Sequence, residues 1–575
     1  MRFLHVLCVL CGLALPGLAL DREAFTFTNY NLDVRVEPEQ QRLAVRGKIT
    51  LRNNSATPQQ NLSLQISSSL NWRSIHLGGK AVQFVSQPYT SDIDHTGALS
   101  EAIVSLPAAV PPKSTVELEI GYEGIVPLDV TRLTRIGVPE EVAKHSDWDQ
   151  IGKSFTAVRG IGYVAWYPVA TESANLSEGN SVFETLGRWK ARETQAEMKI
   201  NPVYSRGSSE VLPTLLCNGK QTNQLIEEMG RAQLLTADCS FSQLGLTAPA
   251  FAIGQYSVLD RPTIKIYHSP EHKSAAENYA LAAELAVAFT TEWFGAPRAK
   301  AEIVELADPE AAPFESGSML LTPLNGGDSK LAQLTAVHQL THAAFPSPRP
   351  WIYEGLAHFA QAAYRERQSG RQSALDFMGL HRTAIANAER ERAAEHNQNA
   401  GANESLINTA SEEFYRSKAM YVWWMLRDMA GEEALKKALA NYRPNQDKEP
   451  SYVQHLIEAQ TKRDLEWFFD DWVYRDRGLP DFRVESAYPR PTVGGGYVVT
   501  VTVQNLGDAG AEVPVTLRME GGEVTRRLEV HAKSRASIRI EAAATPHEIV
   551  VNDGSVPESD MSNNAFKIDG ASLHK

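Results

Sequence analysis

Apolar and polar side chains alternate with a period of two over the first part of the chain. The alternation is clear at 30–36, 43–49 and 116–120, and turn-forming clusters separate these runs. Successive side chains of a strand point to opposite faces of a sheet, so the pattern is typical of strands with one buried face. It predicts a large antiparallel β-sandwich over residues 21–258, whose last clear strand is 251–258.

The pattern becomes helical in the middle of the chain. Ser269 followed by Pro270 is a typical helix start, and Leu281, Leu285, Ala288 and Phe289 are spaced to form the apolar face of that helix. Helical periodicity dominates as far as residue 473, in runs at 331–343, 351–367, 374–394, 412–429 and 432–442.

Strand-like alternation returns after residue 478, at 497–504, 524–530 and 537–541. Short strands separated by glycine turns predict an immunoglobulin-like β-sandwich over 479–575. A chain of 575 residues is too long for a single core. We therefore expect a multidomain α+β protein with boundaries near 258 and 478.

The first twenty residues have their own character. Arg2 is followed by an almost entirely apolar run at 3–15 and by the small residues Gly17 and Ala19. This predicts a secretory signal peptide over 1–20; the alternative is an uncleaved anchor, for which the run is short. No later stretch is long and apolar enough to span a membrane, so we expect a secreted or periplasmic protein without a transmembrane segment after cleavage.

The net charge limits the kinds of partner that the protein can bind, and the cysteine content bears on disulfide formation. The net charge of −13 argues against nucleic acid as a partner, because phosphate binding needs a basic surface. Two cysteines, Cys217 and Cys239, remain after signal cleavage. In an oxidising compartment they predict one disulfide, which would contribute roughly 3 kcal/mol; two separate buried thiols are the alternative.

One histidine pair stands out on the central helices. His338 and His342 are four residues apart, so their imidazoles leave one face of a helix and suit two ligands of one zinc ion. Such a pair is weak evidence alone, since His268 and His272 have the same spacing. That second pair straddles Pro270 at a helix start, so His268 is not expected to share the helical face.

A second helix can complete the histidine site. Pro350-Trp351-Ile352-Tyr353-Glu354 opens it, after a short loop rich in proline that can fold it back on the first helix. Glu354 would then supply a third ligand. Three protein ligands and one open position are typical of catalytic zinc.

These segments carry a family resemblance. His338-Gln339-Leu340-Thr341-His342, followed by Trp351-Ile352-Tyr353-Glu354-Gly355, resembles the HExxH and W-x-x-E-G pattern of gluzincin zinc metallopeptidases. Residues 251–256, 415–418 and 464–472 are similar to segments of the aminopeptidase N-like (membrane alanine aminopeptidase) members. The resemblance covers most of the mature chain. It implies an N-terminal sandwich, a thermolysin-like and mainly helical catalytic-type domain, a C-terminal β-domain, one zinc ion, and a peptide or protein substrate or ligand.

The motif departs from the family at Gln339, where the resemblance implies a glutamate that acts as general base. An amide can hydrogen-bond a water molecule but cannot hold a proton near neutral pH. Such a base contributes about 10²- to 10⁴-fold to the rate, so hydrolysis should fall at least that far. Glu315 and His358 are the candidates for a replacement base.

A second departure concerns substrate binding. The family segment G-x-M-E-N corresponds to Gly317-Ser318-Met319-Leu320-Leu321, which implies substrate contacts from Gly317, Ser318 and Met319. The acid that binds the amino terminus of a substrate is missing at Leu320. The gap of eleven residues between His342 and Glu354 is also shorter than the aminopeptidase pattern. Exopeptidase specificity is therefore not implied.

Tyr415 matches the family tyrosine that stabilises the oxyanion of the tetrahedral intermediate; the alternative is a core tyrosine in an aromatic helix.

Three hypotheses follow for the whole chain. It is a zinc-binding metallopeptidase relative with reduced or lost hydrolysis, an active peptidase with another base, or a metal-free structural or peptide-binding relative.

Overall fold

The computed structural model describes residues 20–89, 99–126, 130, 134, 139–145, 149–158, 165–171, 192–193, 195–207, 212–230, 232–244, 249–324, 329–398, 405–409 and 411–568. The predicted signal peptide, 1–20, lies outside them apart from its last residue. Within these ranges, no helix has the length and apolar character needed to cross a membrane.

Three sheets share the N-terminal apolar core. The largest has the order β13 (Lys220–Met229), β14 (Ala232–Phe241), β11 (Glu197–Gly207), β1 (Phe25–Glu37), β2 (Arg42–Asn53), β8 (Thr115–Ile125), β4 (Leu70–Leu77) and β5 (Lys80–Ala81). The second has the order β3 (Gln59–Ser67), β7 (Leu99–Val110) and β6 (Gln83–Tyr89). The third has the order β12 (Thr214–Cys217), β15 (Phe251–Gly254), β10 (Phe155–Val158) and β9 (Gln150–Ile151).

The predicted alternation matches burial in these strands. In β1, Leu32 and Val34 are fully buried, whereas Asp33 and Arg35 between them are exposed. The prediction of a purely antiparallel arrangement is wrong at one place, because β1 pairs with β11 in parallel. A parallel neighbour requires a long crossover connection, which local alternation cannot reveal. Cys217 and Cys239 form the predicted disulfide, which links β12 to β14.

A five-stranded sheet follows, in a region predicted to be mainly helical. Its order is β16 (Ser257–Asp260), β17 (Ile264–His268), β18 (Ala301–Glu305), β20 (Met319–Thr322) and β19 (Phe314–Ser316). The predicted strand 251–258 is in fact two strands, β15 and β16, in different sheets. Strands of three to five residues are too short to show a period, and β18 buries adjacent residues such as Ile303 and Val304.

The first long helix, α4 (Lys273–Phe294), begins as predicted. The Ser269 side chain accepts a hydrogen bond from the N–H of Glu271 in the short 3₁₀ turn η3 (Pro270–His272). The predicted apolar face is wrong in part, since Leu281 and Leu285 are 58% and 63% exposed. The buried face consists of alanines together with Tyr279, Phe289, Trp293 and Phe294.

The other helices are α5 (Ser329–Ala344), α6 (Pro350–Ser369), α7 (Arg371–Gly379), α8 (Arg382–Gln398), the π-helical turn η4 (Glu413–Lys418), α9 (Ala419–Ala430), α10 (Glu432–Asn441), α11 (Tyr452–Thr461), α12 (Glu466–Phe469) and the π-helical turn η6 (Asp470–Tyr474). Shorter helical pieces are η1 (Pro38–Gln40), α2 (Glu140–Lys144) and η5 (Pro444–Gln446). The predicted helix 374–394 is two helices, because the chain turns between α7 and α8.

Seven strands form two antiparallel sheets at the C-terminal end. One has the order β21 (Phe482–Pro491), β22 (Tyr497–Asn505) and β25 (Arg535–Ala542). The other has the order β24 (Gly522–Val530), β23 (Ala511–Met519), β26 (Pro546–Val551) and β27 (Ala565–Lys567). Their apolar core is continuous with that of the helices. The domain boundaries at 258 and 478 stay predictions.

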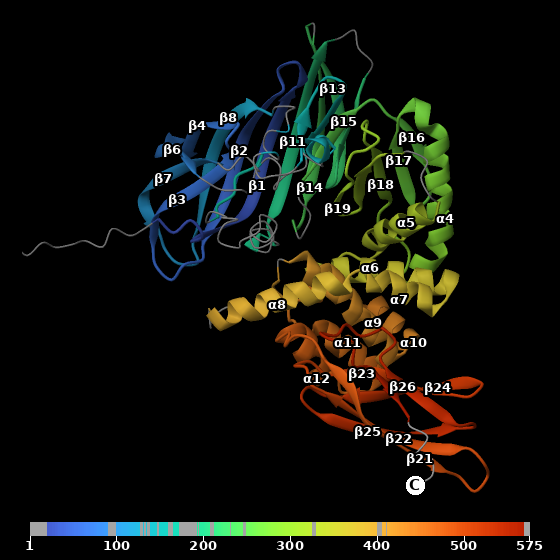
Figure 1. Cartoon of the computed structure of the whole chain (residues 1–575). Helices are drawn as coiled ribbons and strands as arrows, with labels where there is room; N and C mark the ends of the chain where they lie inside the picture. Colours follow the sequence, from blue (N-terminus) through green and yellow to red (C-terminus); the bar gives the residue numbers. More distant parts are fainter. Residues whose placement is uncertain are drawn as a thin grey trace, which may run out of the picture.

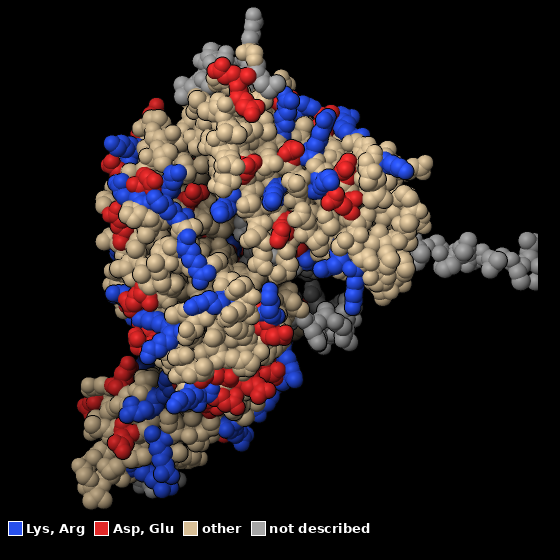
Figure 2. Space-filling model, turned by 180° about the vertical axis from the view of Figure 1, so that it is seen from behind, with Lys and Arg blue, Asp and Glu red and all other residues tan. Residues whose placement is uncertain are grey.

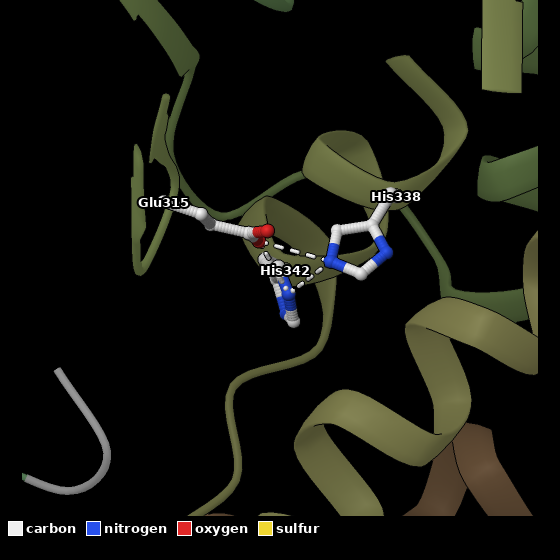
Figure 3. A group of neighbouring side chains, drawn as sticks. All are labelled: Glu315, His338 and His342. Atoms are coloured by element: carbon white, nitrogen blue, oxygen red, sulfur yellow. Dashed lines mark hydrogen bonds and ion pairs between the residues drawn. The ribbon is translucent and has the colours of Figure 1, made fainter. Parts of the chain in front are cut away.

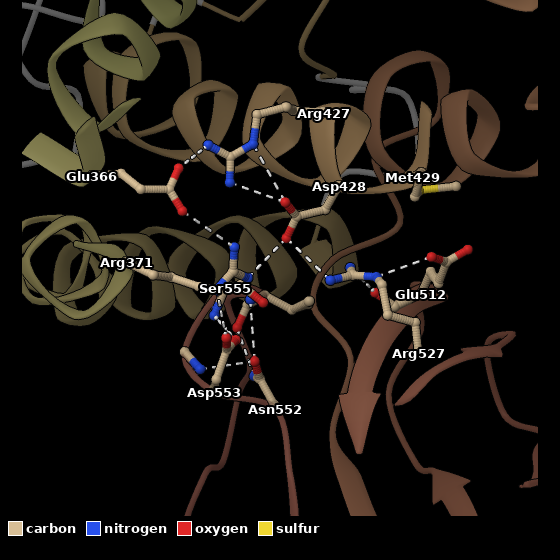
Figure 4. A network of polar contacts seen from close by, with 12 residues as sticks. Glu366, Arg371, Arg427, Asp428, Met429, Glu512, Arg527, Asn552, Asp553 and Ser555 are labelled. Atoms are coloured by element: carbon tan, nitrogen blue, oxygen red, sulfur yellow. Dashed lines mark hydrogen bonds and ion pairs between the residues drawn. The ribbon is translucent and has the colours of Figure 1, made fainter. Parts of the chain in front are cut away.

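The helices α6 to α9 lie between the N-terminal sheets and the C-terminal sheets (Figure 1). A charged network joins α9 to the C-terminal strands (Figure 4), and Asp428 is its centre. Asp428 pairs with Arg371 at 2.9 Å, Arg427 at 3.0 Å and Arg527 at 3.1 Å. On the face shown in Figure 2, positive and negative side chains are interspersed.

Candidate metal centre

The C-terminal half of α5 is buried on all sides, and it carries both histidines of the motif. His338 is 6% exposed and His342 is 4% exposed. Their imidazoles leave the same face of the helix, as predicted, and their Nε2 atoms lie 3.0 Å apart. By contrast, His268 lies at the end of β17 and His272 in η3, so the second pair does not share a helical face, also as predicted.

A carboxylate from the five-stranded sheet meets the two imidazoles. Oε1 of Glu315, on β19, lies 2.9 Å from Nε2 of His338 and 2.9 Å from Nε2 of His342 (Figure 3). β19 and β20 form a hairpin around Gly317, which has a φ of 63° and so takes a conformation that favours glycine. The hairpin directs Glu315 toward α5.

These three atoms fit a zinc ion. They form a nearly equilateral triangle whose corners lie about 1.7 Å from its centre, less than the zinc–ligand distance of about 2.1 Å. An ion just above the triangle can therefore contact all three. Two imidazoles and a carboxylate are also a donor set that catalytic zinc uses. Among the described residues, Glu315, His338 and His342 form one of two groups with ligand atoms close enough to hold a metal.

Glu315 and the two histidines shift one another's pKa values. Burial disfavours a charge on His338, but the Glu315 carboxylate outweighs burial and raises the pKa of the imidazole. Burial likewise disfavours a charge on Glu315, but His338 and His342 outweigh it and hold the pKa of the carboxyl well below its usual range. Glu315 is therefore ionised at neutral pH and available to a cation.

Glu354, the ligand expected from the sequence, lies beside this triangle at the start of α6. Its Oε1 is 3.8 Å from Nε2 of His342, and its Oε2 is 3.9 Å from Nε2 of His338. Arg416 donates from Nε to Oε2 of Glu354 at 3.1 Å. Sequence reasoning gave Arg416 no role; its place directly after Tyr415 was the only signal. The role of Glu354 as a ligand stays a prediction.

Gln339 and Tyr415, the two positions predicted to act in hydrolysis, make no contact in the described part of this structure that shows such a role. Gln339 is buried, and its Oε1 has no hydrogen-bond partner among the described residues. Tyr415, in η4, donates its hydroxyl to Glu412 at 3.2 Å. Burial raises the pKa of Tyr415, so the hydroxyl stays protonated. The oxyanion role of Tyr415 also stays a prediction.

His358 packs against the cluster from α6. Its ring lies 5.0 Å from that of His338, and its Nδ1 has no hydrogen-bond partner among the described residues. Burial, followed by the charge of His338, lowers the pKa of His358 well below its ordinary value. His358 is therefore neutral. Together with His338 and Glu354 it makes the second group whose ligand atoms lie close enough for a metal.

A cavity of about 320 Å³ opens beside His342, with Ser318, Arg298 and Tyr353 in its lining. Tyr353 stacks on the His342 ring at 3.9 Å. Of the segment predicted to contact substrate, Ser318 thus faces the cavity and Gly317 makes the adjoining turn. Met319 is 1% exposed and belongs to the apolar core. Its predicted contact with substrate would need movement of that core.

Comparisons with known proteins leave the family open. No protein-family model matches the chain, and no curated protein matches it. Among solved structures, the chain is similar to a point mutant of the M1 zinc metallopeptidase from Deinococcus radiodurans, with 14% identity and a TM-score of 0.45. The likeness covers 80% of this chain and 96% of that protein. It is too weak to assign a family.

Proposed function

We propose that this chain is an exported zinc-binding protein of the gluzincin metallopeptidase type, aminopeptidase N-like in architecture, in which peptide hydrolysis is weak or lost. The observation that carries the proposal is the meeting of Glu315 Oε1 with both histidine Nε2 atoms at 2.9 Å. The motif resemblance at His338, His342 and Glu354 supports the same chemistry.

The chain's own residues limit what this site can do. A zinc ion bound with an open position would supply Lewis-acid polarisation of a carbonyl oxygen. Gln339 can orient a water molecule by hydrogen bonding but cannot take its proton. Leu320 cannot bind the ammonium group of a substrate's amino terminus. The cavity with Ser318 and Arg298 can still hold a peptide, through hydroxyl and guanidinium groups.

A second candidate, an active peptidase, is favoured by one observation. His358 is in its neutral form and its Nδ1 has no hydrogen-bond partner among the described residues, although its lowered pKa makes it a weak base. Its ring packs edge-to-face against that of His338, with the ring centroids 5.0 Å apart, so it borders the site directly. This reading predicts peptide hydrolysis that His358→Ala abolishes and a chelator inhibits.

Zinc content and turnover, measured on the same preparation, separate these readings. After dialysis against zinc-replete and then metal-free buffer, wild type should retain about one zinc per chain, and His338→Ala should retain less than about a tenth. Wild type should hydrolyse a mixture of aminoacyl and internally cleaved peptides no faster than the chelated protein does. Robust chelator-sensitive hydrolysis by wild type would overturn the loss of activity, and absence of zinc would overturn the metal site.

A further inference from the structure

We propose that Glu315 is a fourth protein ligand, so that zinc is held by His338, His342, Glu354 and Glu315 together with no open position. The inference rests on the zinc binding proposed above and deepens it. Closed sets of four protein ligands are typical of structural zinc, whereas catalytic zinc keeps one position open. The site would therefore hold its metal without exposing it to a substrate.

The distances bring three of the four donors together and place Glu354 beside them. Ligands about 2.1 Å from a tetrahedral zinc lie about 3.4 Å from one another. The separations within the triangle of Glu315, His338 and His342 are 2.9, 2.9 and 3.0 Å. Those from Glu354 to the two histidines are 3.8 and 3.9 Å. The tetrahedral value lies between the two sets. Among the described residues, Glu315 and Glu354 belong to different groups of ligand atoms close enough for one metal, so the four-ligand set requires the Glu354 side chain to move toward the triangle.

The hairpin explains why Glu315 reaches the metal. Glu315 on β19 pairs directly with Leu320 on β20, and paired residues project from the same face of a sheet. The acid that the family pattern places at 320 is thus absent, but an acid projects from the same face one strand away. In this chain, Glu315 meets the histidines at 2.9 Å, within the reach of a shared metal.

Charge supports the same set of ligands. Two carboxylates balance the two positive charges of zinc, and the two imidazoles bind as neutral groups. A buried site that is neutral overall avoids the cost of an unpaired charge. Arg416 holds Oε2 of Glu354, which leaves Oε1 as the oxygen that faces His342 at 3.8 Å. An outer partner of this kind orients a metal ligand.

Replacing zinc by Co²⁺ shows whether the metal has an open coordination position, and it needs no assay of activity. The visible spectrum of Co²⁺ in a tetrahedral site changes when an exogenous ligand enters. The full-length protein would be loaded with Co²⁺ and titrated with acetohydroxamate, beside Glu315→Gln, Glu315→Ala and the control Glu284→Gln on the exposed side of α4. Zinc affinity would be measured for each by competition with a chromogenic chelator.

Wild type and the Glu284→Gln control should show one spectrum, unchanged by acetohydroxamate. Both Glu315 variants should bind zinc roughly tenfold or more weakly, and their cobalt spectra should respond to the hydroxamate. If wild type binds metal but its spectrum already responds, or if both Glu315 variants retain wild-type affinity, the fourth-ligand assignment is overturned while zinc binding stands. If wild type binds no metal, the proposed function fails and this inference fails with it.

Discussion

Oε1 of Glu315 lies 2.9 Å from Nε2 of His342, although one residue comes from a hairpin strand and the other from the buried end of α5. The contact joins the five-stranded sheet to the helix that carries the histidines. If zinc is the common partner of both groups, metal and fold are coupled, because the ligands come from separate elements.

Removal of the metal should therefore lower stability. We expect the wild-type midpoint of thermal unfolding to rise with free zinc and to fall after chelation, because zinc binds the folded site. At a zinc concentration about a hundredfold above Kd, the gain is about 2.7 kcal/mol. His342→Ala should unfold at the same temperature with and without zinc. A zinc-dependent shift that persists in this variant would place the metal elsewhere.

Arg416 should tune the site through Glu354. Replacing it by glutamine removes the partner of Oε2 and frees the carboxylate to turn away from the histidines. We expect zinc affinity to fall about tenfold, as for other outer partners of metal ligands, while the fold measured by circular dichroism stays intact. Arg490→Gln on β21 is the matched control. Unchanged affinity in Arg416→Gln would show that Glu354 does not depend on this contact.

The substitution Gln339→Glu, which restores the missing general base, should by itself raise peptide hydrolysis very little. If Glu315 occupies the fourth position, Gln339→Glu supplies a proton acceptor but gives water no place to be activated. The double variant Gln339→Glu with Glu315→Gln should hydrolyse peptides at least about tenfold faster than either single variant. Gln504→Glu, far away on β22, controls for the added charge. Equal rates for Gln339→Glu and the double variant would argue for an already open site.

Asp428 is expected to hold the helices to the C-terminal strands. Its neighbours Arg371, Arg427 and Arg527 would lose their shared partner in Asp428→Asn. Because Arg371 and Arg527 are about a third exposed, water limits the loss to about 1–3 kcal/mol of unfolding free energy. Chemical denaturation measures it. A change below the error of that measurement would mean that the network contributes nothing.

Glu193 gives a prediction for pH. Burial raises its pKa to about 8, and Tyr30 donates a hydrogen bond to it at 2.8 Å. The unfolded chain loses this proton near the ordinary carboxyl pKa, so Glu193 destabilises the fold increasingly as pH rises from about 4.5 to about 8. Glu193→Gln should unfold at higher denaturant concentration than wild type at pH 8, but not at pH 4. The same difference at both pH values would refute this.

Several parts of the structure could be predicted from local sequence pattern. The period-two strands, the Ser269 cap and the shared face of His338 and His342 all follow from spacing between near neighbours, and the disulfide follows from the two cysteines left after signal cleavage. The five-stranded sheet could not be predicted, because its strands are short and carry no period. The exposure of Leu281 and Leu285 could not be predicted either. The buried face of α4 consists of alanines and aromatic residues, and alanines contribute little to a hydrophobic pattern because they are small.

In the candidate site, too, some features could be predicted from local sequence pattern and others could not. The helical spacing places His338 and His342 together, since both lie on one element. Glu315 reaches them only because β19 and β20 form a hairpin in a sheet that the sequence did not reveal. Arg416 meets Glu354 because η4 packs on α6, a contact between residues far apart in the chain. Local pattern contains no information about such contacts.

The most direct test of the central claim is the zinc content of the full-length protein after dialysis, measured by elemental analysis beside His338→Ala. We expect about one zinc per wild-type chain and less than about a tenth in the variant. A wild-type chain that retains no more zinc than His338→Ala would contradict it.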